Sequence, residues 1–316
     1  MSVLMYLVAY LAIAVFAIAV AVRFFGYLRN PIHVRWELYP VAHEGKRASY
    51  GGSYLEEVDW WEKPREVSML GELKVMIPEI LFLKAVWEHN RPLWFVSFPF
   101  HFGLYLIAAL IGLLGVGAIA QLAGAAVGPG AGGLGSWLHR LPVVLGPIAF
   151  GLCGLGALGL LLRRLLDADI RRYSSVGHYF NLALFLVVLG LAAYTWRAAD
   201  ADFALARGFL ANLIAFRLEP VGGALFGVQV IVASLLLAYI PLTHMSHFFM
   251  KYFLYHDIRW GDEPNVDSPK TAARIATVLN YPVTWAAPHV AIPGRSTWAE
   301  VATFNPAAEA EEDKEQ

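Results

Sequence analysis

The sequence predicts an all-α integral membrane protein with five transmembrane helices. Hydrophobic residues make up 58% of the 316 positions and charged residues only 16%, whereas soluble domains usually carry about 25% charged residues. Five apolar segments come close to, or exceed, the roughly 20 residues that a helix needs to cross the hydrocarbon core. The formal net charge of -1 gives no reason to expect a nucleic-acid partner.

The five apolar segments cover residues 3–22, 93–122, 141–162, 179–196 and 222–241. The first has no basic region before it and no small-residue cleavage site after it, so we expect a retained helix over residues 1–26 rather than a cleaved signal peptide. We expect the fifth segment to continue as a helix to residue 252. The second to fifth segments would then form a four-helix bundle over residues 93–252.

The placement of Lys and Arg predicts the orientation, because cytoplasmic loops carry an excess of these residues. No basic residue precedes the first segment, and the loop between the second and third has none before Arg140. Basic residues gather between the first and second segments, between the third and fourth, and after the fifth; the last two groups are Arg163, Arg164, Arg171, Arg172, Lys251, Arg259, Lys270 and Arg274. We therefore expect the N-terminus outside the inner membrane of the cell and the C-terminus in the cytoplasm.

Two polar segments would lie on the cytoplasmic side. Residues 27–92 contain the amphipathic stretch LKVMIPEILFLKAVW, for which we expect a helix at the membrane interface. Residues 253–316 form a tail that is rich in Pro, Trp and charge and ends in the acidic AEAEEDKEQ, for which we expect disorder. We expect these two segments to dock a soluble partner.

The single cysteine, Cys153, lies in the apolar run GLCGLGALGL. One thiol cannot form an internal disulfide or hold an iron–sulfur cluster, which needs several thiolates. We interpret Cys153 as a small packing residue between helices. Any iron–sulfur cluster that works with this chain would therefore belong to another subunit.

Two histidines, His101 and His247, lie in the second segment and in the predicted extension of the fifth. An ionisable residue within a membrane span is a functional-site hypothesis, and imidazole is a common ligand of haem iron. Both lie toward the cytoplasmic ends of their segments, at comparable depth. We therefore predict that His101 and His247 are the axial ligands of the iron of a b-type haem; a hydrogen bond to a neighbouring helix is the alternative for each.

Two further histidines leave several roles open. His178 begins the fourth segment, and His244 lies one turn before His247. They are candidates for hydrogen bonds between helices, a quinone site, contacts to haem propionates, or a second haem. A quinone pocket at this end would draw on His178, Tyr179, Asn181, Tyr239, Thr243 and His244, and one nearer the outer face on Gln121, Gln229 and Ser234. The residues alone favour neither side.

The stretches SFPFHFGLYLIAALIGLLG and GVQVIVASLLLAYIPLTHMSHFFMKYF carry a resemblance to a known family. With the flanks RNPIHVRWELYPVAHE, YGGSYLEEVDWWEKPRE and YPVTWAAPHV, the chain resembles the membrane cytochrome b subunit family of respiratory nitrate reductase (gamma subunit). It is more similar still to the sulfate-reducer transmembrane-complex and heterodisulfide-reductase-like branch. The resemblance covers nearly the whole chain.

The resemblance implies a haem b subunit of a quinone-linked respiratory complex. Such a subunit transfers electrons between membrane menaquinone or ubiquinone and a cytoplasmic iron–sulfur subunit of the heterodisulfide-reductase type. A periplasmic multihaem cytochrome c is a further implied partner, and membrane lipid surrounds the helices. On this interpretation the chain is part of an oxidoreductase and is not catalytic alone.

The resemblance also implies positions for two haems, each held by one histidine from the second segment and one from the fifth. The cytoplasmic-side pair falls on His101 and His247, and the outer pair falls on Ile111 and Gln229. Because neither Ile111 nor Gln229 is a haem ligand of that type, the resemblance implies one haem here. A second haem would have to use His178 and His244.

Two other function classes stay as alternatives. A haem-free membrane anchor for a redox complex would show no visible-light absorbance and would tolerate His101→Ala. A transporter would usually show internal repeats or broken helices with charged residues near the midplane, and we find neither in this sequence.

Overall fold

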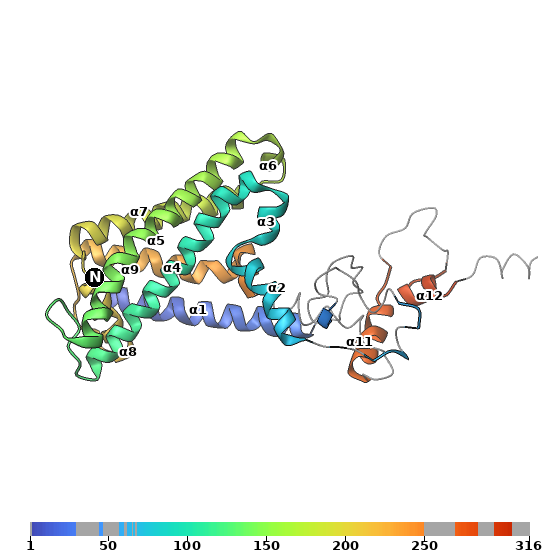
Figure 1. Ribbon diagram of the computed structural model, residues 1–316, viewed down its shortest axis with the longest axis horizontal. Helices are drawn as coiled ribbons and strands as arrows, with labels where there is room; N and C mark the ends of the chain where they lie inside the picture. The colour runs from blue at the N-terminus through green and yellow to red at the C-terminus, as the bar shows by residue number, and fades with distance from the viewer. Residues whose placement is uncertain are drawn as a thin grey trace, which may run out of the picture. The chain divides into compact units, whose positions relative to one another are not determined.

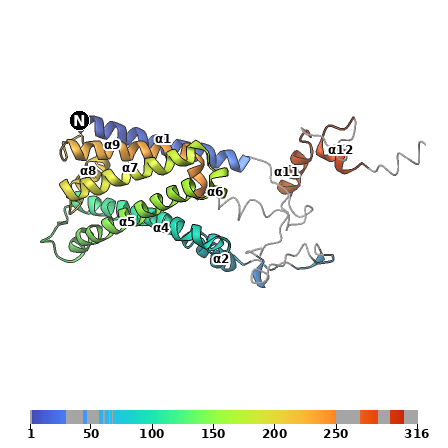
Figure 2. The same cartoon turned by 90° about the horizontal axis from the view of Figure 1, so that it is seen from above.

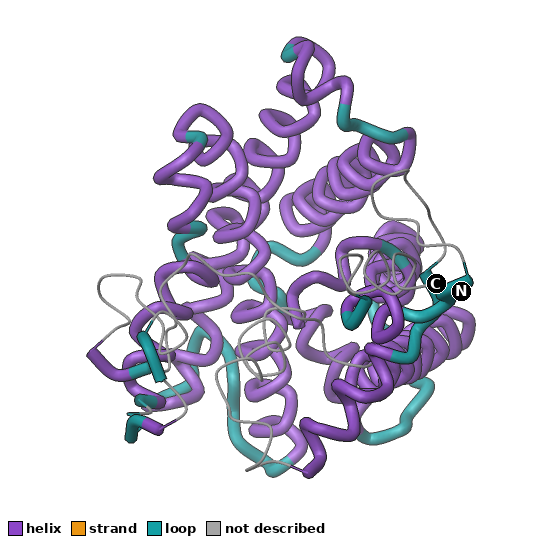
Figure 3. The backbone as a smooth tube through the Cα atoms, turned by 90° about the vertical axis from the view of Figure 1, so that its right-hand side faces the viewer, coloured by secondary structure: helices purple, strands orange, loops and turns teal. Residues whose placement is uncertain are grey.

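The computed structural model describes residues 2–29, 44–46, 57–59, 62–64, 66, 68–249, 269–283 and 294–304. Within these ranges the regular structure is helical, and an isolated β-bridge joins Pro282 and Thr297 (Figure 3). The chain divides into two compact units. One comprises Met1–Ala21 and Lys74–Ser246, and the other comprises Val22–Leu73 and His247–Gln316.

Among the described residues, five helices are long and apolar enough to cross a membrane, so the chain is a multi-pass membrane protein. They are α1 (Ser2–Arg29), α4 (Arg91–Leu122), α5 (Gly133–Leu166), α7 (Val176–Ala199) and α9 (Ala224–Tyr239) (Figure 1). Each of the five predicted apolar segments corresponds to one of these helices. The predicted all-α membrane class is thereby confirmed at this level.

The amphipathic stretch before α4 forms two short helices, α2 (Met69–Leu81) and α3 (Lys84–His89). Leu83 separates the two helices, and its backbone adopts the left-handed conformation with a φ of 51°. The Tyr105 hydroxyl of α4 donates to the carbonyl of Ile80 at 2.6 Å, and the Trp94 indole N–H donates to the carbonyl of Phe82 at 2.7 Å. These bonds satisfy carbonyls at the end of α2 and hold it against α4.

Helices α4 and α5 pack side by side through glycines, and α7 lies between α5 and α9 (Figure 2). A β-carbon on Gly156 of α5 would lie 2.6 Å from the Cα of Phe100, and one on Gly103 of α4 would lie 2.7 Å from the Cα of Cys153. Small residues let membrane helices approach this closely. Cys153 is fully buried in this contact, as expected of a packing residue.

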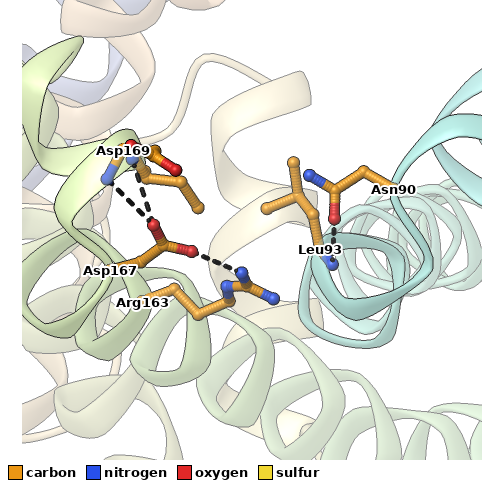
Figure 4. A network of polar contacts seen from close by, with 6 residues as sticks. Asn90, Leu93, Arg163, Asp167 and Asp169 are labelled. Atoms are coloured by element: carbon orange, nitrogen blue, oxygen red, sulfur yellow. Dashed lines mark hydrogen bonds and ion pairs between the residues drawn. The ribbon is translucent and has the colours of Figure 1, made fainter.

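The basic segment after α5 is folded as the short helix α6 (Ala168–Arg172). Asp167 caps it by accepting from the backbone N–H groups of Asp169 at 3.1 Å and Ile170 at 3.3 Å, and it pairs with Arg163 at 2.7 Å (Figure 4). The hydrogen bond from Arg163, together with these backbone bonds, lowers the pKa of Asp167. The same figure shows the Asn90 side chain, which caps the start of α4.

A helix that the sequence analysis did not predict, α8 (Ala204–Ile214), lies between α7 and α9. Its 11 residues are apolar but too few to span a membrane. Both carboxylate oxygens of Asp200 cap its start, accepting from the backbone N–H groups of Leu205 at 2.8 Å and Ala206 at 2.9 Å. The buried Asp200 thus satisfies two backbone donors that a helix start leaves unpaired.

Tyrosines of α1 attach this helix to α8 and to the segment after it. Tyr6 stacks on Phe209 with ring centroids 5.1 Å apart, and its hydroxyl donates to the carbonyl of Glu219 at 2.8 Å. The Tyr10 hydroxyl donates to the carbonyl of Leu213 at 2.7 Å. Carbonyls at and after the end of α8 are thereby satisfied without water.

The fifth span departs from the predicted continuous helix to residue 252. The α-helix α9 ends at Tyr239, and two 3₁₀ helices follow, η4 (Ile240–Leu242) and η5 (His244–Phe249). Pro241 lacks a backbone N–H and so cannot donate to the α-helical ladder. Residues 250–252 lie outside the described ranges.

The described C-terminal part of the second unit includes the short helices α11 (Pro269–Leu279) and α12 (Trp298–Ala302). Thr297 and Glu300 form a reciprocal capping box at the start of α12. Backbone bonds from Val283 to Ser296 at 2.8 Å and from Trp298 to Tyr281 at 3.2 Å connect the ends of the two segments. The acidic end, residues 308–316, for which the sequence predicts disorder, lies outside the described residues.

The close α4–α5 contact predicts different effects of substitution at two nearby glycines of α5. Gly156→Ala places a methyl group against the backbone of Phe100, and we expect it to destabilise the protein by about 1–3 kcal/mol. Gly154→Ala meets nothing within 4 Å and should be neutral or slightly stabilising, because Ala favours the helix. Thermal unfolding in detergent, followed by a dye that reacts with the buried Cys153 thiol, measures both. Equal unfolding midpoints for the two variants would contradict the close contact.

Candidate functional site

His101 lies in α4 and is half-buried. Its Nδ1 lies 2.8 Å from the backbone carbonyl oxygen of Ser97, with the Ser97 hydroxyl 3.4 Å from the same nitrogen. A carbonyl oxygen only accepts, so Nδ1 carries the proton and Nε2 carries the lone pair. Metal-ligating histidines use this arrangement, in which the second ring nitrogen donates to a carbonyl. The local geometry of His101 therefore fits an iron ligand.

His247, its predicted partner, lies in η5 and is exposed. It belongs to the unit that contains Val22–Leu73 and His247–Gln316, whereas His101 belongs to the other unit. The pairing of these two histidines across one haem stays a prediction.

The structure brings together four of the predicted polar residues where α7 begins and α9 has ended. The rings of His178 and His244 lie 4.8 Å apart between centroids. The Asn181 side-chain nitrogen lies 3.4 Å from His244 Nε2, and the Tyr239 hydroxyl donates to Asn181 Oδ1 at 2.8 Å. We call His178, Asn181, Tyr239 and His244 the histidine cluster.

Two other predicted residues form hydrogen bonds to backbone carbonyls outside the histidine cluster. The Tyr179 hydroxyl donates to the carbonyl of Arg164 at 2.9 Å, which connects α7 to α5. The Thr243 hydroxyl donates to the carbonyl of Ile240 at 3.1 Å within its own turn. Both bonds serve to satisfy backbone carbonyls near helix ends.

The start of α7 sets the protonation of His178. The backbone N–H of Ser175 donates to His178 Nδ1 at 2.9 Å, as part of a capping box. Because Nδ1 accepts this bond, the neutral ring carries its proton on Nε2. His178 is thus a hydrogen-bond donor through Nε2, which suits a quinone oxygen. Ligation of a second haem through Nε2 would require the capping box to break.

A cavity of about 400 Å³ lies between α4, α7, α8 and α9, with Phe150 of α5 also in its wall. On α4 the lining begins at Leu104, one turn after His101, and reaches Leu114. Ile111 and Gln229, the two positions that the resemblance pairs as an outer haem site, both line it. The structure therefore places these two positions on the wall of one cavity.

The wall of the cavity is apolar except for a few side chains, which are Thr195, Asp200, Gln229 and Ser234 with the indole of Trp196. Thr195 is only 3% exposed. Its Oγ1 and the Oε1 of Gln229 are buried, and neither has a hydrogen-bond partner in the part of the chain that the structure describes. Buried polar atoms are normally paired, so these two are exceptions beneath the surface of the cavity wall.

Two charged side chains are buried in this region, Asp200 in the cavity wall and Arg207 on α8. Arg207 of α8 is 2% exposed and packs over Gly117, whose β-carbon would lie 2.9 Å from the arginine Cδ. Burial lowers the pKa of Arg207 and raises that of Asp200. Sequence reasoning assigned no site role to Thr195, Asp200 or Arg207, because nothing in the order of residues shows that these positions are buried together.

No protein-family model, curated protein or solved structure matches the chain. The resemblance to the nitrate reductase membrane subunit family therefore depends on the motifs quoted above, and membership of that family stays a proposal.

The raised pKa of Asp200 predicts a pH dependence of stability. Between the ordinary Asp pKa of about 3.9 and the raised value, the folded protein binds more protons than the unfolded chain. The contribution of Asp200 to stability therefore falls as the pH rises through this window. Asp200→Asn removes the titration, so the unfolding midpoint of the wild type, relative to this variant, should be higher at pH 4 than at pH 7. A difference that is constant between the two pH values would show that Asp200 is not desolvated.

Proposed function

We propose that the chain is the cytochrome b subunit of a quinone-linked respiratory complex in the inner membrane. The observation that carries this proposal is the hydrogen bond of 2.8 Å from His101 Nδ1 to the Ser97 carbonyl within a membrane-spanning helix. It leaves the lone pair on Nε2, which is the tautomer that iron ligation needs. The sequence motifs around His101 and His247 support the same proposal independently.

Haem b would be held by His101 of α4 and His247 of η5, with one haem per chain. A bis-histidine haem has no open coordination site and transfers single electrons. The chain's own residues would position and insulate this group. Ser97 orients the His101 ring, and the apolar helices around it exclude water. The four-helix arrangement of α4, α5, α7 and α9 around the haem is part of this proposal.

The partners are those that the family resemblance implies, and the proposed orientation, with the N-terminus outside and the C-terminus in the cytoplasm, assigns each to its side of the membrane. Menaquinone or ubiquinone would be the membrane substrate. An iron–sulfur subunit of the heterodisulfide-reductase type would dock on the cytoplasmic segments, and a multihaem cytochrome c would be the periplasmic partner. The rival proposal, a haem-free anchor for a redox complex, shares the fold and differs in the absence of haem.

The proposal predicts about one haem b per purified chain, measured as pyridine haemochrome. His101→Ala removes the ligand nitrogen, and we expect it to abolish haem binding and the visible absorbance bands. His89→Ala, on the exposed side of the short helix α3, is the matched control and should keep the wild-type haem content.

The haem content separates the alternatives. A folded wild-type chain that binds no haem when haem is supplied would disprove the cytochrome proposal and favour the anchor. A content near two haems would require a second site, and the histidine cluster would then be tested by His178→Ala and His244→Ala. Retention of haem in His101→Ala would remove His101 from the ligand set.

A further inference from the structure

We propose that Arg164 and His178 bind the phosphate of an anionic phospholipid between the end of α5 and the start of α7. The inference depends on the membrane class of the chain, which its five long apolar helices show, and it does not rest on the proposed cytochrome function.

Hydrogen bonds hold Arg164 against the segment that leads into α7. Its Nη1 donates to Ser174 Oγ at 2.8 Å, and its backbone carbonyl accepts from the Tyr179 hydroxyl at 2.9 Å. The Ser174 hydroxyl in turn donates to the carbonyl of Ile170 at 2.8 Å. The half-buried guanidinium is therefore fixed beside the start of α7, so that little side-chain entropy is lost when it binds a ligand.

The positive charge of Arg164 is not neutralised by an acidic side chain in the described part of the chain. The neighbouring Arg163 takes the nearest acidic partner, because it pairs with Asp167 at 2.7 Å (Figure 4). From residue 163 to residue 178 the chain carries four arginines and two aspartates. The excess of positive charge attracts an anion to this end of the two helices.

The start of α7 supplies further donors for an anion. The first N–H groups of a helix have no intrahelical partner and form the positive end of its dipole. His178 Nδ1 accepts from the Ser175 backbone N–H, so the neutral ring has an Nε2–H group left to donate. The charge of Arg164 acts on this ring, so the two side chains are neighbours. A guanidinium and a phosphate form hydrogen bonds that are stronger than those between neutral groups.

The position of these donors favours a lipid as the source of the phosphate. Arg164 and His178 each lie within one turn of the end of a membrane-spanning helix, which is the depth of lipid head groups. Tyr173 between them is 86% exposed, and tyrosine is enriched at the membrane–water interface. The exposed Leu162 and Phe180 offer apolar surface to acyl chains. Basic pockets between transmembrane helices bind anionic head groups in this way.

Arg171 and Arg172 favour an anionic head group over a zwitterionic one. Both are exposed at the end of α6. The backbone carbonyl of Arg171 accepts from the N–H of Ser174 at 3.0 Å, so this charged segment lies next to the site. The choline of phosphatidylcholine would be repelled by these guanidinium groups, whereas the uncharged glycerol of phosphatidylglycerol would not.

The test is native mass spectrometry of the purified full chain in detergent, titrated with phosphatidylglycerol or with phosphatidylcholine. We expect the wild type to bind phosphatidylglycerol more tightly. Arg164→Gln removes the charge but keeps a donor for Ser174, and it should weaken this binding by about tenfold, as the loss of one charge-assisted hydrogen bond implies. Arg164→Lys should restore part of the affinity. Arg197→Gln, exposed near the other end of α7, is the matched control and should bind as the wild type does.

Four results would overturn the proposal. Equal affinities of Arg164→Gln and Arg197→Gln would remove Arg164 from the site. Displacement of the lipid by inorganic phosphate would assign the site to free phosphate. A wild type that does not distinguish the two lipids would leave the arginines to an acidic protein surface. Loss of haem b with unchanged lipid binding in Arg164→Gln would assign Arg164 to a haem propionate.

Two features of the design keep these results separable. Haem content is measured on every variant, so the failure of this proposal and the failure of the cytochrome proposal are distinct observations. The comparison of the two lipids uses the wild type alone, so it tests the proposal even if Arg164→Gln does not fold.

Discussion

Every backbone N–H and C=O group in the hydrocarbon core of a membrane must find its partner within the protein, and this constraint organises the structure. The five long helices satisfy most of these groups by themselves. Where helices end, side chains supply the missing partners. Asp200 caps the start of α8, and the hydroxyls of Tyr6, Tyr10 and Tyr105 donate to carbonyls at or after the ends of α8 and α2. Polar side chains in this protein thus connect helices by completing backbone hydrogen bonding.

Contacts with backbone groups also give two histidines opposite tautomers. His101 Nδ1 lies on a carbonyl oxygen, which places the lone pair on Nε2. His178 Nδ1 accepts from a backbone N–H at a helix start, which places the proton on Nε2. The neutral His101 ring therefore has its lone pair on Nε2, whereas the neutral His178 ring has its proton there. The tautomer of each ring is decided by the backbone group that its Nδ1 contacts, and residue type alone does not give it.

The helices pack closely in one place and leave a cavity in another, and a ligand would be expected in the cavity. Helices α4 and α5 meet at Gly103 and Gly156 so closely that no β-carbon fits. On its other side α4 faces α9 across a cavity that extends from Leu104 to Leu114. Ile111 and Gln229 lie on that cavity wall, at positions where neither side chain can ligate haem. The wall of this space is apolar except for a few side chains, among them Gln229 and Thr195.

The sequence by itself determined the membrane class, the five spans and the positions of His101 and His178 within them. These features depend on the hydropathy and charge of about 20 consecutive residues, which are local properties of the chain. Only the tertiary structure decided the 3₁₀ continuation that holds His247, the short helix α8 with its Asp200 cap, the joining of His178 to His244, and the cavity at Thr195 and Gln229. Each of these features depends on contacts between groups in different turns or helices of the chain. A polar atom becomes buried and unpaired only through such contacts, so the order of residues alone does not reveal it.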